Sequence, residues 1–202
     1  MDILMKNKIV FFDFDGTITY RDSLIDFIRF AVGNSQFILG ICYLLPMLVL
    51  FKLKLIPNDK AKEKMLSYFF KDMEISQFKA LAQQYSSTEI DKILRPKAIK
   101  KIKAYQDEGY EVVVVSASME CWLSSWCKKQ NITLIATKLE VKDNKLTGKF
   151  ATKNCHGEEK VKRIKVLYEL DTYSEIHAYG DSQGDKALLA LADKSFYKPF
   201  RS

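Results

Sequence analysis

The chain is poor in the features that mark disulfide scaffolds, zinc modules and secreted proteins. It has four cysteines in 202 residues, none in a Cys-x-x-Cys pair and none at a zinc-binding spacing. We therefore expect reduced thiols, most of them packing groups, as in a cytosolic protein. Residues 1–8 are charged and run straight into an apolar segment, so no secretory signal is expected there. Internal repeats and low-complexity tracts are absent, which predicts a globular chain.

Acidic residues are the minority charge. Lys and Arg total 32 against 25 Asp and Glu, and the formal net charge is +7. The lysines are interleaved with acids along the chain, a pattern more typical of a solvated surface than of a nucleic-acid interface. We therefore expect no nucleic-acid partner, whereas anionic substrates or anionic lipid would be attracted.

The apolar run from Phe37 to Phe51 lacks charge but is short. As a helix it would extend about 22 Å, against roughly 30 Å for a hydrocarbon core, so we expect no transmembrane span. Pro46 is expected to kink it. Two interpretations of residues 37–55 remain. We favour a hydrophobic helical hairpin packed internally; the alternative is peripheral membrane contact, helped by the two lysines that follow Phe51.

The remaining sequence alternates short apolar strands with amphipathic helices, whereas residues 22–94 have helical patterns throughout. Such alternation predicts a parallel sheet with helices on both faces. Residues 142–150 are expected to form a hairpin with Asp143 and Asn144 in its turn. The predicted strands of the sheet are 8–13, 110–118, 131–141, 175–182 and 194–200.

Polar residues gather at the predicted carboxyl ends of three strands, where α/β folds place their chemistry. These clusters are Asp13 with Asp15, Ser116 with Ser118, and Asp181 with Asp185. Burying unpaired carboxylates is costly, so such pairs usually manage a metal ion or a proton. An aspartate can attack phosphorus, carboxylates can bind Mg²⁺, and a neighbouring acid can protonate a leaving alkoxide. The parts needed for phosphoryl transfer are therefore present.

Four motifs in this order resemble those of the haloacid dehalogenase (HAD) superfamily, in its phosphoserine-phosphatase-like subclass IB. They are "DFDGT" at 13–17, "VVVVSAS" with Ser116, "GEEK" with Lys160, and "YGDSQGD" with Asp181 and Asp185. The resemblance implies an α/β fold with a Rossmann-like parallel sheet flanked by helices, an inserted all-helical C1-type cap and a small β-hairpin. It also implies a catalytic core of residues 1–20 and 96–202 and a cap of residues 21–95.

The resemblance further implies a role for each motif residue. Asp13 would be the nucleophile and Asp15 the general acid/base. The Mg²⁺ ligands would be Asp13, Asp15 through its backbone carbonyl, and Asp181, with Asp185 orienting them. Ser116 and Lys160 would bind phosphate, and Thr17 would brace the loop. Lys162 and Lys165 are interpreted as surface charges, although a misplacement by one turn is an alternative. Dehalogenase members lack the second aspartate, so Asp15 favours phosphate-ester chemistry over dehalogenation.

These roles predict a Mg²⁺-dependent phosphomonoester hydrolase that works through an aspartyl-phosphate. Three alternatives stay open: a lipid-phosphate phosphatase of the phosphatidylglycerophosphate type at a membrane surface, a phosphotransferase to an acceptor alcohol, and a non-catalytic membrane-binding or partner-binding module on an inherited fold. The partner would be a small-molecule or lipid phosphomonoester. The expected location is the cytoplasm, with the inner face of the membrane as an alternative.

Substrate specificity is expected to reside in the cap and the loops facing it. Asp22 matches, by its spacing from Asp13, a family glutamate that meets the substrate ammonium, and Ser118 is a second specificity candidate. The family's cap arginine, which binds the substrate carboxylate, has no aligned counterpart; Arg29 and Arg95 are the candidates.

Overall fold

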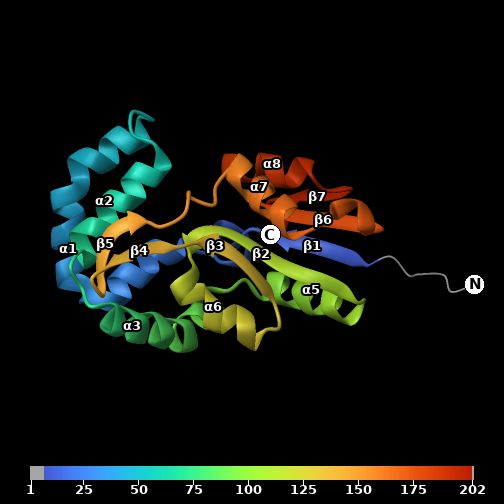
Figure 1. Cartoon of the computed structure of the whole chain (residues 1–202), viewed down its shortest axis with the longest axis horizontal. Helices are drawn as coiled ribbons and strands as arrows, with labels where there is room; N and C mark the ends of the chain where they lie inside the picture. The colour runs from blue at the N-terminus through green and yellow to red at the C-terminus, as the bar shows by residue number, and fades with distance from the viewer. Residues whose placement is uncertain (1–6, 202) are drawn as a thin grey trace, which may run out of the picture.

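The computed structural model describes residues 7–201. Predictions about residues 1–6, including the absence of a secretory signal, and about Ser202 lie outside the described residues. In chain order the elements are β1 (Lys8–Phe12), α1 (Ser23–Lys52), α2 (Asn58–Phe70), α3 (Ile75–Thr88), α4 (Ile90–Ile93), α5 (Pro96–Asp107), β2 (Tyr110–Met119), α6 (Glu120–Lys129), β3 (Thr133–Thr137), β4 (Leu139–Lys142), β5 (Lys145–Phe150), α7 (Glu158–Leu167), β6 (Glu175–Gly180), α8 (Lys186–Ala190) and β7 (Lys194–Tyr197) (Figure 1).

A five-stranded parallel sheet with the order β3-β2-β1-β6-β7 forms the centre of the molecule. β1 lies in the middle and is apolar at successive positions because both of its faces are covered. Val10 and Phe12 belong to the same buried cluster as the apolar residues of α5 and α6, whereas Ile9 and Phe11 cluster with Ile164 of α7. The predicted Rossmann-like sheet with helices on both faces is confirmed.

The register of this sheet brings the polar strand ends together. Phe12 of β1 lies opposite Val114 of β2 and Tyr179 of β6. Asp13 follows Phe12, and its backbone N–H donates to the carbonyl of Tyr179 at 2.9 Å. The polar residues that follow Val114 and Tyr179 therefore lie on either side of Asp13, at one edge of the sheet.

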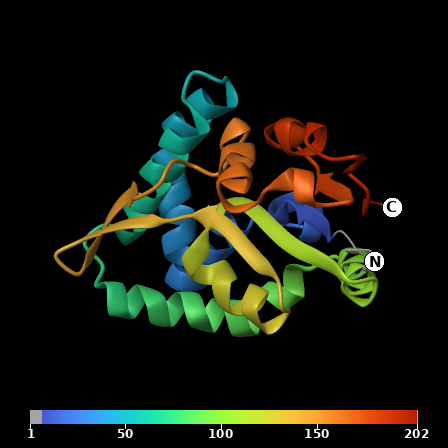
Figure 2. The same ribbon diagram turned by 45° about the vertical axis from the view of Figure 1, so that its right-hand side comes forward.

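Helices α1 to α4, inserted between β1 and β2, form the expected all-helical cap, whereas α5 packs on the sheet. The β4–β5 hairpin packs on the cap (Figure 2). The backbone of the hairpin reaches α2 at Gly148, where an added Cβ would lie 2.4 Å from Ser67 Cα. Gly148 also has a φ of +78°, so a side chain is doubly unfavourable there. The prediction of one strand over residues 131–141 is wrong, because β3 ends at Thr137 and β4 leaves the sheet to join the hairpin.

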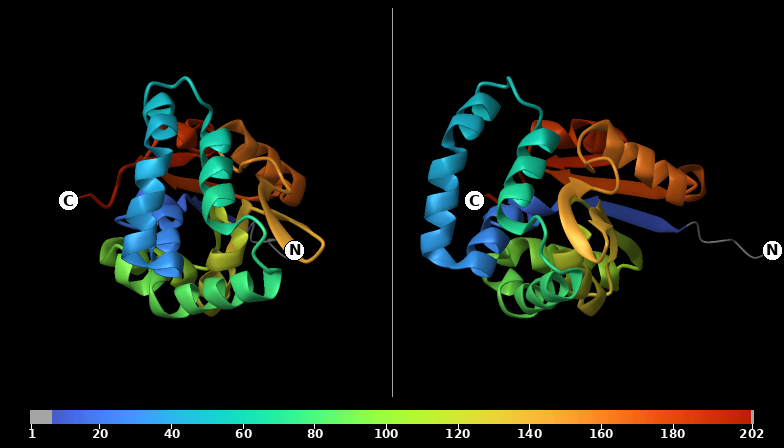
Figure 3. Two further views of the ribbon diagram at one scale, coloured as in Figure 1. Left: turned by 90° about the vertical axis from the view of Figure 1, so that its left-hand side faces the viewer. Right: turned by 60° about the vertical axis from the view of Figure 1, so that its left-hand side comes forward.

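The apolar segment of the cap, residues 37–55, is arranged differently from the predicted hairpin. α1 spans 30 residues and is broken at Gly33 (φ 79°), whose non-helical backbone separates two helical stretches. Pro46 lies inside the second stretch, which stays helical there. Its inner side packs on α2 through Gly40 and Leu44, both buried. Its outer side remains exposed, however, and forms an edge of the molecule (Figure 3). The favoured interpretation of an internally packed hydrophobic hairpin is therefore wrong.

Candidate active site

Asp13 lies in a buried ion-pair network at the end of β1. Lys160, in the first turn of α7, is 1% exposed, and its Nζ donates to Asp13 Oδ1 at 2.6 Å and to Asp185 Oδ1 at 2.8 Å. The other Asp13 oxygen, Oδ2, accepts from Thr17 Oγ1 at 3.0 Å, in keeping with the predicted bracing role of that threonine. Lys162 and Lys165 are exposed, so among these three lysines it is Lys160 that enters the site.

Burial and charge act in opposite directions on this network. Burial raises the pKa of Asp13 to about 7, against the lowering effect of Lys160. Burial would lower the pKa of Lys160, but the two carboxylates outweigh it and raise that pKa above its ordinary value. Burial also opposes ionisation of Asp185, yet Lys160 and Ser182 hold its pKa below the ordinary range. Lys160 is therefore a charged ammonium at any ordinary pH.

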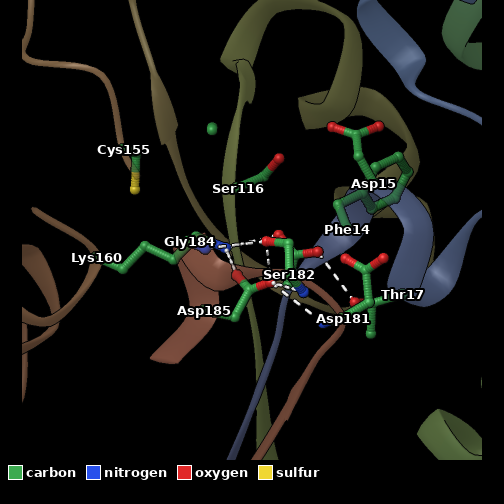
Figure 4. Close-up of polar contacts among 12 residues, drawn as sticks. Phe14, Asp15, Thr17, Ser116, Cys155, Lys160, Asp181, Ser182, Gly184 and Asp185 are labelled. Atoms are coloured by element: carbon green, nitrogen blue, oxygen red, sulfur yellow. Dashed lines mark hydrogen bonds and ion pairs between the residues drawn. The ribbon is translucent and has the colours of Figure 1, made fainter. Parts of the chain in front are cut away.

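Asp181 completes a group of three carboxylates. One oxygen from each of Asp13, Asp181 and Asp185 lies within 4.8 Å of the others, and Figure 4 shows Asp181 and Asp185 next to each other with Lys160 reaching toward them. Asp185 Oδ2 accepts from Ser182 Oγ at 2.7 Å and from the N–H groups of Ser182 and Asp181, so it fixes the loop that carries Asp181. The Asp181 carboxylate also pairs with the guanidinium of Arg201.

This carboxylate group fits a hard divalent cation such as Mg²⁺, which prefers oxygen ligands. The backbone next to the carboxylates must be a glycine for Asp181 to occupy its position. A Cβ added at Gly16 would lie 2.5 Å from Asp181 Oδ2. Gly16 has a φ of +83°, which also favours glycine. The predicted ligands Asp13 and Asp181 are in the group, and so is Asp185, which was expected to orient them. The carboxylate of Asp15 is outside the group; the expected contact of Asp15 is through its backbone carbonyl.

Asp15 points to a different environment, next to the start of the cap. Its Oδ1 accepts from the backbone N–H of Ser23, the first residue of α1, at 2.6 Å, and its Oδ2 accepts from Ser118 Oγ at 2.5 Å. The Ser23 hydroxyl donates to Ser118 Oγ at 3.0 Å and accepts from Trp122 Nε1 at 3.3 Å. This hydrogen-bonded chain fixes the orientation of the Asp15 carboxylate.

The environment of Asp15 also sets its protonation. Burial and the charge of Asp22 raise its pKa to about 6, against the lowering effect of the Ser118 hydrogen bond. The pKa of Asp15 is thus close to neutral pH, where a carboxyl group can both donate and accept a proton. Two aspartates one residue apart in the sequence have different surroundings, which is a pattern typical of sites that need distinct acid and nucleophile roles.

Ser116 and Ser118 come from the same end of β2 and both are fully buried. Ser116 Oγ accepts the backbone N–H of Ser118 at 3.0 Å, which holds the strand end in place. Figure 4 shows Ser116 between Asp15 on one side and Lys160 on the other. Its role in binding phosphate stays a prediction, whereas Ser118 has a structural contact with Asp15 that the sequence did not reveal.

Comparison with known proteins identifies the family of the chain. The profile of the haloacid dehalogenase-like hydrolases matches residues 10–190, which is most of the chain. The chain belongs to the haloacid dehalogenase-like hydrolase family. It is therefore a member of a family of hydrolytic enzymes, as the four motifs predicted.

One relative by sequence and two solved structures show which individual proteins the chain resembles. The chain is 29% identical over 195 residues to Protein CicA of Caulobacter vibrioides, which covers 96% of this chain and 86% of that relative. A crystal structure of a protein of unknown function from Bordetella pertussis Tohama I has a TM-score of 0.79 at 21% identity, covering 94% of this chain and 89% of that one. A phosphoserine phosphatase solved as a phospho-aspartyl intermediate analogue has a TM-score of 0.68 at 21% identity, covering 94% and 85%. The predicted phosphoserine-phosphatase-like fold is confirmed.

The residues predicted to determine substrate specificity, Asp22, Arg29 and Arg95, make contacts in different parts of the structure. Asp22 caps α1, accepting from the N–H groups of Leu24 and Ile25 at 2.9 and 3.2 Å. Arg29 bonds to exposed Asn34, and Arg95 is engaged by the carbonyls of Thr19 and Phe200. Neither arginine is shown in contact with the aspartates described above.

Lys62 of α2 is the cap cation that sequence reasoning missed. Its Nζ donates to the carbonyl of Ala117 at 3.0 Å, between Ser116 and Ser118, and its charge lowers the pKa of Asp15. The sequence offers little to single it out, because Lys60, Lys62 and Lys64 alternate along one amphipathic helix. Only the packing of α2 over the end of β2 distinguishes it.

Proposed function

We propose that the chain is a Mg²⁺-dependent phosphomonoester hydrolase that forms an aspartyl-phosphate on Asp13. The observation that supports it most is the pairing of two contrasting aspartates. Asp13 is bonded to a buried ammonium beside two further carboxylates, whereas Asp15 lies outside that group, held by Ser118 and Ser23. The proposed nucleophile and the proposed proton donor therefore have different surroundings although only one residue lies between them in the sequence.

In the first step, an Asp13 oxygen would attack phosphorus as the bond from phosphorus to the ester oxygen breaks. Protonated Asp15 would give its proton to the leaving oxygen, and the resulting carboxylate would then accept a proton from the water that hydrolyses the aspartyl-phosphate. The Lys160 ammonium would hold the phosphate oxygens, and the Ser116 hydroxyl would help to orient them.

The carboxylate group supplies the ligands for the cation. Asp13 and Asp181 would hold Mg²⁺ with the Asp15 backbone carbonyl, and Asp185, already bonded to Lys160 and Ser182, would keep Asp181 in position. Bound there, the cation would offset the repulsion between anionic nucleophile and anionic phosphate. We place this reaction in the cytoplasm, on a small-molecule phosphomonoester.

The decisive experiment is trapping of the intermediate. Purified protein is mixed with Mg²⁺ and a generic phosphoester, quenched in acid and digested, and the peptide containing Asp13 is analysed by mass spectrometry. We expect phosphate on Asp13 in the wild type and neither phosphopeptide nor turnover for Asp13→Asn, with little change in thermal stability. The exposed Asp171→Asn is the matched control and should behave as wild type. Wild-type turnover by Asp13→Asn would refute the nucleophile assignment.

A lipid phosphomonoester, such as phosphatidylglycerophosphate, is the second candidate substrate. It is favoured by the apolar side chains on the outer side of α1, which are exposed although they belong to the cap that covers the site. A phosphoester panel run with and without detergent would separate the two candidates. Preference for phosphoserine or sugar phosphates over the lipid would count against the second one.

A further inference from the structure

The outer side of α1 carries a contiguous apolar surface, which we call the outer face. It is formed by Leu39, Tyr43, Leu45, Val49, Leu50 and Leu53. Leu39, Tyr43 and Leu50 repeat at helical spacing along one line, and Leu45 and Val49 lie about a third of a turn around the helix. Exposed Cys42, Pro46 and Leu53 lie between these two groups. Leu39 is 68% exposed, Tyr43 72% and Leu45 55%. Exposed apolar side chains gathered in this way mark an interaction surface, whereas single ones need no explanation.

The inner side of the same helix is already occupied. Gly40 lies so close to α2 that an added Cβ would be 2.3 Å from the Phe69 ring, and Leu44 is buried. At the margin of the outer face, Tyr43 also stacks on Tyr68 of α2 with ring centroids 5.1 Å apart. The outer face is therefore presented by a helix that is fixed to the cap.

Among the described residues, α1 is long and apolar enough to cross a membrane by length and composition. Crossing would separate it from α2 or carry α2, with exposed Lys60 and Lys64, into the hydrocarbon, which is costly. A helix anchored on one side and apolar on the other is suited instead to lie along a surface.

The charges around the outer face favour an anionic surface. No Asp or Glu occurs between Asp26 and Asp59, whereas Arg29, Lys52 and Lys54 in that interval are all exposed. Lysines next to an apolar helix are attracted to anionic headgroups. A second copy of the chain fits less well, since a two-fold interface at the end of α1 would bring the same cations together.

We propose that the outer face of α1 docks the protein on a bilayer that contains anionic lipid. Its apolar side chains would enter the boundary between headgroups and acyl chains, with Lys52 and Lys54 at the headgroups. This docking is independent of the catalytic chemistry, because none of these residues contacts the aspartates or Lys160 in the described structure.

Vesicle flotation tests the proposal with the full chain. One set of vesicles contains phosphatidylcholine alone and the other adds about 30% phosphatidylglycerol, which supplies the negative surface potential. We expect the wild type to float with the anionic set. The double variant Leu39→Glu/Leu45→Glu should lose at least about tenfold in partition coefficient. Lys52→Gln/Lys54→Gln should lose roughly fivefold for each lysine, and only on anionic vesicles.

The matched control is Val166→Glu/Leu167→Glu, which places two acids at exposed apolar positions of α7. It should float as the wild type does. Hydrolysis of p-nitrophenyl phosphate and thermal unfolding are measured for each variant, so that lost docking with retained activity is distinguished from failure of the proposed function. The proposal is overturned if the wild type binds neither set, if Leu39→Glu/Leu45→Glu floats normally, or if light scattering reveals a dimer that this variant dissociates.

Discussion

Lys160 and Asp13 form a buried ion pair, with 2.6 Å between Nζ and Oδ1, across 147 residues of sequence. The same ammonium lies 2.8 Å from Asp185, so one cation serves two buried carboxylates. Lys160 is thus required by the fold as well as by the proposed chemistry. Its two contributions can be separated by experiment.

Replacing Lys160 with methionine should destabilise the protein and abolish turnover. The variant keeps most of the side-chain volume but leaves Asp13 and Asp185 buried without their cation, a change that costs about 3–5 kcal/mol. We expect that loss in the free energy of unfolding, measured by urea titration near neutral pH. Exposed Lys162→Met on the same helix is the control and should change it by less than about 0.5 kcal/mol. Equal stabilities of the two variants would contradict the buried pair.

The proton-donor role of Asp15 predicts a dependence on the leaving group. Asp15→Asn cannot protonate the departing oxygen, so alkyl phosphates should lose about 10²–10⁴-fold in kcat/KM, which reports formation of the aspartyl-phosphate and not its hydrolysis. p-Nitrophenyl phosphate should lose far less, because its phenolate leaves without a proton. Ser118→Ala removes the 2.5 Å hydrogen bond to Asp15 and should show the same trend at smaller amplitude. Exposed Ser124→Ala is its control. Equal losses on both substrates would exclude the proton-donor role.

Much of the core could be predicted because its signals are local. The strand 9–12 is apolar at every position, which is typical of a strand buried on both faces, and the aspartates follow it directly. In a parallel sheet the carboxyl ends of the strands share one edge, so the sequence was enough to place Asp13, Ser116 and Asp181 at that edge. That β1 lies between β2 and β6 was not predicted and comes from the structure. Lys160 followed from its motif and not from its surroundings.

The cap could not be predicted to the same depth because its contacts are tertiary. A helix that is apolar all round gives no sign of which side will find a partner, so the exposure of the outer face of α1 was missed. The hairpin joins α2 through Gly148 and Ser67, 81 residues apart. Likewise, Lys62 contacts Ala117 across 55 residues, and its helix contains equally spaced lysines.

Lys62 should favour substrates that carry a second anionic group. It extends from the cap to the end of β2 near Asp15, so its ammonium is placed to attract a carboxylate on the substrate. We expect Lys62→Gln to raise KM for phosphoserine by about tenfold or more, the value of one charge-assisted contact. KM for p-nitrophenyl phosphate should change by less than about threefold. Lys64→Gln, exposed on the same helix, is the control, and equal effects on the two substrates would contradict this role.

Glu175 forms a cluster at the opposite end of the sheet. It accepts from Lys194 Nζ at 2.6 Å, Tyr110 Oη at 2.5 Å and His177 Nε2 at 2.8 Å. These hydrogen bonds, that of Lys194 foremost, lower the pKa of Glu175 from 4.5 to about 2. A carboxyl group whose pKa is depressed by folding stabilises the native state while it is ionised. The cluster should therefore make stability depend on pH in acid.

The sign of this effect follows from the depressed pKa. The contribution of Glu175 is complete above 4.5, its ordinary pKa, and is lost as the pH falls toward about 2. The Tm of Glu175→Gln should therefore lie below that of the wild type by a constant amount between about pH 8 and pH 6, and the gap should narrow by about pH 3. Thermal unfolding of both proteins across this range is the measurement, with exposed Glu169→Gln as the control. A gap that stays constant to pH 3 would mean that the ionised carboxylate of Glu175 contributes nothing beyond the hydrogen bonds a neutral amide can make.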